Sequence, residues 1–423
     1  MAEQHGKTLV PQIRFAGFTD PWEQRKLGEL FEESDERASD REILSVSVAN
    51  GIYPASESDR ETNPGASLAN YKVVHSGDVV YNSMRMWQGA VDASRYDGIV
   101  SPAYVVAKPN SEVYARFFAR LLRQPMLLKQ YQQVSQGNSK DTQVLKFDDF
   151  ASIEISMPAS ENEQRQIGAF FDRLDSLITL HQRKYDKLCV LKKSMLDKMF
   201  PKGGSLYPEI RFAGFTDPWE QRKLGELTEI KDSARIPNRL WREAGVPYIR
   251  ASDISQEDLR GALFIDEEDY AAYKAATGAP EKGDVLFNGG GEIGKAIING
   301  NSSPIYVQGG AVLYARIAHS SLLDARYLVA AFVTQNVVNA IGVLSAGGTM
   351  KHFTLQPAKN LPIEVPSIAE QRRIGAFFDR LDSLITLHQR KYCGVVSWML
   401  GVALVRLGSE SDGAFGEMKH VLR

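Results

Sequence analysis

The sequence is poor in cysteine and histidine: its 423 residues include two cysteines and seven histidines. Cys189 and Cys393 can form neither a disulfide scaffold nor a cysteine-based zinc cage, which fits a reducing compartment. The first ten residues lack the charged and apolar regions of a secretory signal. The mostly apolar run 393–405 is too short to cross a bilayer. We therefore expect a cytoplasmic protein without a membrane segment.

An excess of charge of one sign is also missing. The formal net charge is −2, and a content of 43% hydrophobic and 24% charged residues is typical of globular domains. A dedicated nucleic-acid binder usually carries a basic footprint, so composition alone gives no sign of such a partner. The length predicts about three domains.

Catalytic motifs are absent as well. We find no zinc-type spacing of His and Cys, no nucleophile elbow and no dinucleotide fingerprint. Residues 289–296, GGGEIGKA, nearly match a phosphate-binding loop, but Ala296 replaces the hydroxyl residue that binds Mg²⁺ and no helix is expected after it. The sequence therefore predicts no catalytic residue and no metal site. A glycine-rich loop that approaches a DNA backbone is a better interpretation of this segment.

What the sequence does contain is an internal repeat. Residues 11–30 and 208–227, which we call the lead repeats, differ only at Gln12/Glu209. Residues 163–185 and 370–392, the helical repeats, differ only at Gln166/Arg373. The stretches between them, 31–162 and 228–369, resemble each other only faintly. Two pseudo-equivalent halves predict an internal two-fold relationship. The repeats would present the same surface twice, and the stretches between them would present two different surfaces. A recent duplication without functional meaning is the alternative.

The first helical repeat predicts a long helix. From residue 163 to 199 apolar residues recur at steps of three and four without a proline, which gives about 55 Å of helix. A narrow apolar stripe on so long a helix favours a partner helix, and its own copy is the obvious one, in antiparallel orientation. Two separate amphipathic helices, each on its own core, are the alternative. The residues expected to pair are Ile167, Phe171, Leu174, Ile178, Ile374, Phe378, Leu381 and Ile385.

The second copy diverges after Tyr392, where Gly394 and Gly401 weaken a helix, so an irregular or repacked tail is the alternative to a second helix as long as the first. The variable stretches have mixed α+β character. We expect strands near 79–82, 104–106 and 153–155 and near 285–288, 312–314 and 363–365. Helices are expected over 114–131 and 322–341, each followed by a glycine-containing loop, 135–140 and 345–350.

These features together resemble the specificity (S) subunit of type I restriction–modification enzymes over residues 13–392. The resemblance rests on the order of the variable and repeated regions and on three motifs. These are the opening at 15–23 with its copy at 212–220, the Gly-Asp-Val turns at 77 and 283, and the Glu-Gln-Arg-x-Ile helix starts at 163 and 370.

The resemblance implies an α+β fold in which two mixed α/β target recognition domains are separated by two long antiparallel helices. Each domain would read one half of a bipartite, asymmetric site on double-stranded DNA. The chain would dock two methyltransferase (M) subunits that methylate adenine N6 and, through them, restriction (R) subunits. It would itself be non-catalytic and bind no cofactor, because S-adenosylmethionine, ATP and Mg²⁺ would lie on the partner subunits.

The expected division is 1–162 as the first recognition domain and 163–200 as the central helix. Residues 201–369 form the second recognition domain, and 370–423 form the C-terminal helix with its divergent tail. Polar loop residues are the candidates for reading base edges. They are Arg85, Asn138, Ser139, Lys140, Asn288, Lys295, Thr349, Lys351 and His352.

Two other functions stay open at this point. One is a recombined scaffold that binds the same partners without specific DNA recognition, and the other is an ATP-hydrolysing site at 289–295. We expect the lead repeats to shape the start of each domain, with Phe18 and Trp22 packed inside.

Overall fold

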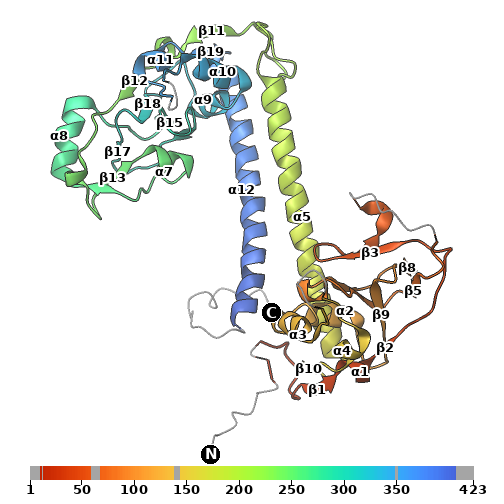
Figure 1. The fold of residues 1–423 in the computed structure, drawn as a ribbon. Coiled ribbons are helices and arrows are strands. Elements are labelled where there is room, and N and C mark those ends of the chain that lie inside the picture. The colour runs from red at the N-terminus through yellow and green to blue at the C-terminus, as the bar shows by residue number, and fades with distance from the viewer. Residues whose placement is uncertain (1–9, 12, 59–66, 138–142, 348–350, 406–423) are drawn as a thin grey trace, which may run out of the picture. The chain divides into compact units, whose positions relative to one another are not determined.

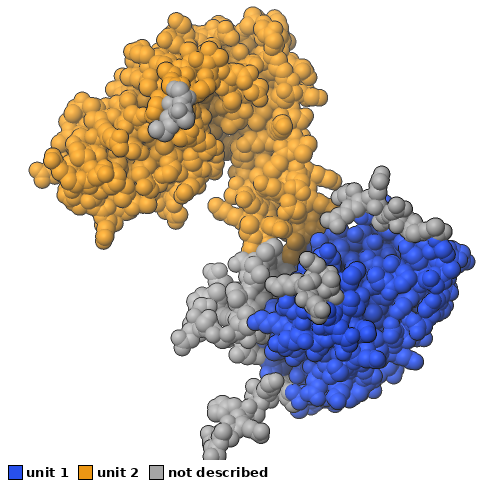
Figure 2. All heavy atoms as spheres, viewed as in Figure 1, with its two compact units in different colours: residues 1–177 blue, residues 178–423 orange. Residues whose placement is uncertain are grey.

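The computed structural model describes residues 10–405 except 12, 59–66, 138–142 and 348–350, with side chains described as far as Gly394. The chain divides into two compact units, residues 1–177 and 178–423 (Figure 2), and each is described by itself. The boundary falls inside the long helix α5, Glu161–Met199.

Unit 1 is built on a four-stranded antiparallel sheet with the order β2-β9-β6-β7. Three two-stranded sheets, β1-β10, β3-β4 and β5-β8, accompany it. The strands are β1 (Glu23–Lys26), β2 (Phe31–Glu33), β3 (Leu44–Ser47), β4 (Gly51–Pro54), β5 (Lys72–Val74), β6 (Val79–Asn82), β7 (Val91–Ala93), β8 (Gly98–Val100), β9 (Tyr104–Pro109) and β10 (Glu154–Met157). The helices are α1 (Leu27–Leu30), η1 (Ala55–Glu57), η2 (Met86–Gln88), α2 (Ala115–Leu121), α3 (Pro125–Val134), α4 (Phe147–Ala151) and the first part of α5.

The central strand β6 is buried on both faces, which explains its unbroken apolar run. Val79 and Tyr81 belong to a core that includes residues of α2, α3 and α4, and the Tyr81 ring lies 5.1 Å from that of Phe150. Val80 points to the other side, where it packs with Val46 and Val106. Alternating residues of one strand thus serve two cores.

Unit 2 repeats this architecture although its variable stretch has a different sequence. Its main sheet has the order β12-β18-β15-β16, accompanied by β11-β19 and by a three-stranded sheet, β14-β13-β17. The strands are β11 (Glu220–Lys223), β12 (Ile230–Asp232), β13 (Val246–Ile249), β14 (Phe264–Ile265), β15 (Val285–Asn288), β16 (Ala296–Ile298), β17 (Tyr306–Val307), β18 (Val312–Ala315) and β19 (Pro362–Val365). The helices are α6 (Leu224–Leu227), η3 (Asn238–Leu240), α7 (Ala251–Ser255), α8 (Glu267–Thr277), α9 (Ala325–Phe332), α10 (Gln335–Leu344), α11 (Leu355–Lys359) and α12 (Ile368–Val405). The α+β fold class is confirmed.

The same glycine–aspartate turn precedes the central strand of both sheets. Gly77 and Gly283 have φ of 101° and 94°, which an L side chain rarely adopts. The buried carboxylates of Asp78 and Asp284 each accept a backbone N–H at 2.8 Å, from His75 and Glu281. Burial raises the pKa of both aspartates. The turn is therefore a structural device that aligns the strand behind it.

Two expected helices are each divided in the structure. The region 114–131 forms α2 and α3, because Pro125 opens α3 and holds Gln124 in an extended conformation with ψ of 139°. The region 322–341 forms α9 and α10, which meet at 74°. There Thr334 is extended, and its hydroxyl donates to the carbonyl of Ala331 at 2.7 Å. The prediction of single helices is wrong in both places.

Helices α5 and α12 lie side by side in unit 2 (Figure 1). Their contacts run antiparallel: the Nδ1 atoms of His181 and His388 are 3.0 Å apart, and further along α5 Lys192 pairs with Asp382. The apolar cluster of unit 2 combines Leu188 and Met195 of α5 with Leu381 of α12. The expected helix pair is confirmed, and α12 continues through Gly394 and Gly401 to Val405 rather than ending at the divergence.

The apolar residues expected at the helix pair have mixed roles. Phe378 and Leu381 lie in the cluster that joins the two helices, but Ile374 in that cluster also meets α9. Ile167 packs against the core of unit 1 instead. Ile178 and Ile385 are half-buried, as are Phe171 and Leu174. The apolar residues in the first turns of each long helix therefore complete the apolar core of their own domain.

Candidate nucleic-acid interface

Two loops of unit 1 meet beside the end of strand β6. One is residues 83–90, which contain η2, and the other is residues 135–146, which follow α3. The backbone N–H of Leu145 donates to the carbonyl of Ser83 at 2.9 Å. An isolated antiparallel bridge between Gln136 and Val144 closes the second loop. We call these two loops the reading loops of unit 1, because they carry residues that are predicted from the sequence to read bases.

The reading loops of unit 2 lie at the equivalent place, after β15 and after α10. Residues 289–294 form a tight loop that is closed by the N–H of Asn288, which donates to the carbonyl of Lys295 at 2.9 Å. The second loop, 345–352, is closed by a bridge between Ala346 and His352. Phe353 joins the two loops through its N–H, which donates to Gly289 at 2.8 Å. Both units therefore use one construction with different residues.

Arg85 is the described candidate of unit 1, and it is exposed at the start of η2. Its guanidinium donates to the side-chain oxygen of Gln88 at 3.1 Å, so it is held over its own loop. Trp87, which the sequence reading did not select, donates its indole N–H to the carbonyl of Met84 at 3.1 Å. The other candidates of this unit lie outside the described residues; they are Asn138, Ser139 and Lys140.

Unit 2 places three described candidates on or beside its two reading loops. Lys351 and His352 are exposed on the second reading loop, and Lys295 closes the first one. The Lys295 ammonium lies 2.7 Å from the carboxylate of Glu257. Thr349 lies outside the described residues.

Asn288 differs from its prediction as a loop residue. It is the last residue of β15 and is fully buried. Its amide donates to the carbonyl of Ala251 at 3.0 Å and to the hydroxyl of Ser255 at 3.2 Å. The interpretation as an exposed reader is wrong because the strand continues to this position, and the side chain instead fixes helix α7 against the sheet.

The resemblance of 289–296 to a phosphate-binding loop has no structural counterpart. Lys295 is followed directly by strand β16 and not by a helix, so no helix N-terminus faces the loop. The lysine is also paired with Glu257. An ATP-hydrolysing site at this position is therefore excluded by the local geometry.

The two kinds of repeat make a contact that the sequence reading missed. Arg14 of the lead repeat forms two hydrogen bonds of 2.7 Å with Glu163 of the helical repeat, and Arg211 does the same with Glu370. The glutamate side chains are only 1% exposed. The lead repeat also pairs as a strand with the segment before the helix, β1 with β10 and β11 with β19. The signal that could have revealed this contact is that both partners lie in repeated segments.

The glutamine beside each buried glutamate repeats in the same way. Gln164 accepts from the N–H of Tyr114 at 2.8 Å, and Gln371 accepts from the N–H of Asp324 at 3.0 Å. Trp22 and Trp219 are buried as expected, whereas Phe18 is half-buried. We call these contacts the framework of each half. They tie the lead repeat and the variable stretch to the start of the long helix.

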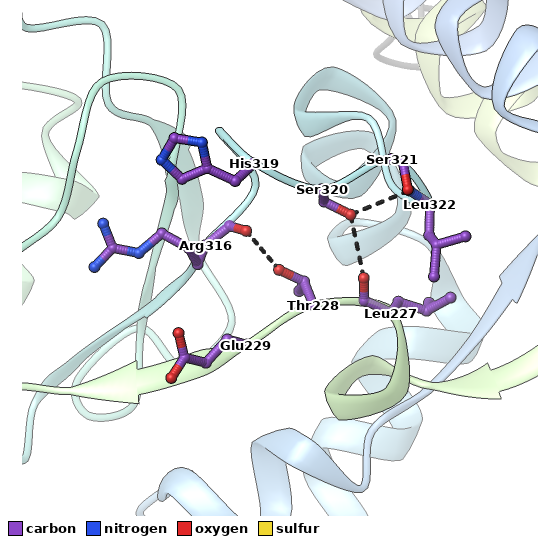
Figure 3. A pocket seen from close by; sticks show the side chains of 8 residues that line it. All are labelled: Leu227, Thr228, Glu229, Arg316, His319, Ser320, Ser321 and Leu322. Carbon is purple, nitrogen blue, oxygen red and sulfur yellow. Dashed lines mark hydrogen bonds between the residues drawn. The ribbon is translucent and has the colours of Figure 1, made fainter.

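A shallow hollow of about 320 Å³ in unit 2 has no features of a catalytic centre (Figure 3). Two of its hydroxyl groups bond to carbonyl groups of other lining residues: Thr228 donates to Arg316 at 2.7 Å, and Ser320 donates to Leu227 at 3.2 Å. In the part of the chain that the structure describes, no three His, Cys, Asp or Glu side chains gather as a metal site.

Among the described residues, no single helix has both the length and the apolar composition for a membrane span. The bent pair α9 and α10 passes by length and composition only, and α9 is largely buried in the core of unit 2.

Comparison with known proteins gives concordant results. A family described as the type I restriction modification DNA specificity domain matches residues 19–189 and 216–394. The type I restriction enzyme MjaVIII specificity subunit of Methanocaldococcus jannaschii is 22% identical over 258 residues, 57% of this chain and 58% of that protein. The alignment thus spans somewhat over half the length of this relative.

A second relative, from Haemophilus influenzae, is 24% identical over 164 residues, 38% of this chain and 40% of its own length. Among solved structures, the S subunit of a type I restriction-modification system from M. genitalium superposes with a TM-score of 0.53. That comparison covers 96% of this chain and all of the other at 14% identity. At this identity the likeness concerns the fold.

Proposed function

This chain belongs to the type I restriction modification DNA specificity family, and from that premise we propose that it selects the DNA site of a type I restriction–modification complex. Each unit recognises one half of a bipartite, asymmetric site through its own reading loops. The chain carries out no chemistry itself, binds no cofactor and acts in the cytoplasm.

The observation that carries this proposal is the contrast between framework and loops. The contacts of Arg14 with Glu163 and of Arg211 with Glu370 are the same in both halves, whereas the reading loops differ in length and sequence. A protein that reads two different half-sites needs two different base-contacting surfaces on equivalent supports. The mild acidity of the chain is compatible with this if partner subunits supply most of the phosphate contacts.

The partners follow from the same premise. Two copies of one methyltransferase subunit would recognise the surface that the repeats present twice, and restriction subunits would join through them. S-adenosylmethionine, ATP and Mg²⁺ would be bound by these partners. The paired helices α5 and α12 would set the spacing between the half-sites.

The second candidate function is a scaffold that assembles without specific DNA recognition. The observation that favours this scaffold is the abrupt divergence after Tyr392, because the two helical repeats continue with different sequences from this point. Such a protein would bind the methyltransferase subunits but leave DNA unmethylated.

Co-expression with the cognate methyltransferase subunits, followed by sequencing of methylated adenines, tests the proposal. We expect methylation at one bipartite motif. Exchange of 228–369 for the corresponding stretch of another specificity protein should change one half of the motif and leave the other half intact. A stable complex without methylation would support the scaffold, and an exchange that alters both halves would contradict separate reading.

A further inference from the structure

Glu257 has an unusual backbone conformation for its residue type. Its φ is 57°, and it is the one non-glycine residue with positive φ in the described part of the chain. It follows helix α7, where the N–H of Glu257 donates to Ile254 at 3.0 Å and that of Asp258 donates to Asp253 at 2.9 Å. This is the helix ending at which glycine is the usual residue, because a side chain is strained there. A glutamate that keeps this conformation suggests a use for its carboxylate.

The carboxylate of Glu257 lies against the first reading loop of unit 2. Its Oε1 is 2.7 Å from the Nζ of Lys295, and the two side chains are 64% and 28% exposed. Helix α7 is fixed at this place by the buried amide of Asn288, which bonds to Ala251 and Ser255. Asn288 also closes the reading loop through its backbone contact with Lys295. One buried residue therefore aligns both members of the ion pair.

A lysine held by a carboxylate is a poor anchor for phosphate, because the charge that would attract phosphate is compensated. The ion pair instead presents a hydrogen-bond donor, the Lys295 ammonium, beside a hydrogen-bond acceptor, the Glu257 carboxylate. In the major groove a G·C pair presents the guanine O6 and N7 acceptors beside the cytosine N4 donor. O6 and N4 are hydrogen bonded to each other in the base pair, about 2.9 Å apart. The separation of the protein groups matches this spacing.

We propose that Glu257 and Lys295 together read one G·C base pair in the half-site of unit 2, with Lys295 donating to guanine and Glu257 accepting from cytosine N4. The inference rests on the proposed function and names two specificity-determining residues within it. It also gives a role to the pairing of Lys295, the residue before β16, with the residue that ends the turn after α7.

The test uses the whole complex with its methyltransferase subunits and compares methylation rates on the motif and on single-base variants of it. Glu257→Gln removes the charge and one acceptor, and Glu257→Gly removes the side chain while suiting the backbone conformation. We expect both variants to lose about 5- to 100-fold of the discrimination at one G·C position of one half-site. Glu268→Gln, on the exposed start of α8 in the same unit, is the matched control and should leave discrimination unchanged.

Three outcomes would contradict the inference. Discrimination in both Glu257 variants could stay within twofold of wild type at every position, the rates could fall equally on all sequences, or the half-site of unit 2 could lack a required G·C pair. If the wild-type complex methylates no specific motif, the proposed function itself fails and the inference fails with it. The first three results leave the proposed function intact, so the two failures are distinguishable.

Discussion

The two units share their framework and differ in what the framework supports. In both, an ion pair between a half-buried arginine and a buried glutamate joins the lead repeat to the long helix, and a four-stranded sheet with the same strand order carries two loops at one place. In unit 1 the loop after the central strand contains a short helix with Arg85 and Trp87, whereas in unit 2 it is a run of three glycines closed by Lys295. The comparison shows that two faintly similar stretches form the same sheet topology on the same framework contacts.

The largest expected effect comes from removing one partner of a framework ion pair. Arg14→Ala leaves the Glu163 carboxylate buried without its positively charged partner, and Arg211→Ala does the same to Glu370. Each change should lower the free energy of unfolding of its own half by about 3–5 kcal/mol. Hydrogen exchange resolved along the chain, before and after substitution, measures this half by half.

The matched control replaces both partners, as in Arg14→Met with Glu163→Leu, and should cost much less because no charge is left buried. Equal losses in both halves from a single substitution would contradict independent frameworks.

A smaller effect is expected from the loops that differ. Arg85→Ala should cost about 1–3 kcal/mol of discrimination in the half-site of unit 1, and Lys351→Ala the same in that of unit 2. Methylation rates on variant sites in the full complex measure both. A uniform loss of binding on all sequences would identify the residue as a phosphate contact, and an effect on the other half-site would contradict separate reading.

Equivalent glycines of the two long helices offer a finer comparison. A Cβ at Gly375 would lie 2.7 Å from the backbone nitrogen of Tyr327, whereas one at Gly168 would lie 3.3 Å from the backbone nitrogen of Phe117 and 2.8 Å from Cε1 of Tyr114. The backbone clash is therefore more severe at Gly375. Gly375→Ala should destabilise by about 1–2 kcal/mol, from overpacking partly offset by the helix propensity of alanine. Gly168→Ala should destabilise less in urea unfolding, and the reverse order would be inconsistent with the packing.

The smallest effect concerns the histidines at the helix pair. Burial lowers the pKa of His181 from 6.5, helped by His388, Lys391 and Lys184. The unfolded chain therefore takes up a proton at higher pH than the folded one, and the stability contributed above pH 6.5 is lost as the pH falls through the folded pKa. Thermal unfolding at pH 8 and pH 5 should show a smaller decrease in His181→Gln than in wild type. An equal decrease would mean that other groups account for it.

The repeats are visible in the sequence itself. The long helices, the main strands and the fold class could be predicted from it, because each depends on a local pattern of apolar residues. The division after Arg123 could have been predicted from Pro125, but nothing in the sequence around Val333 marks the bend before α10. The Arg14–Glu163 contact spans 149 residues, so no local pattern reveals it.

The site was predicted less completely. Arg85, Lys351 and His352 are exposed as expected, whereas the burial of Asn288 depends on helix α7, which packs from a distant part of the chain. Glu257 was missed because its backbone conformation has no sequence signal. Base contacts of all these residues stay predictions.

The framework ion pairs close within each half, and this has a genetic consequence. A stretch of coding sequence exchanged between the near-identical repeats would bring a new domain whose two ends already match Arg14 and Glu163, or Arg211 and Glu370. The incoming domain would need to pack only against the strand of the lead repeat and one face of the helical repeat, and both are the same in the two halves. New combinations of domains would thus arise by recombination within the repeats, with the framework contacts already in place.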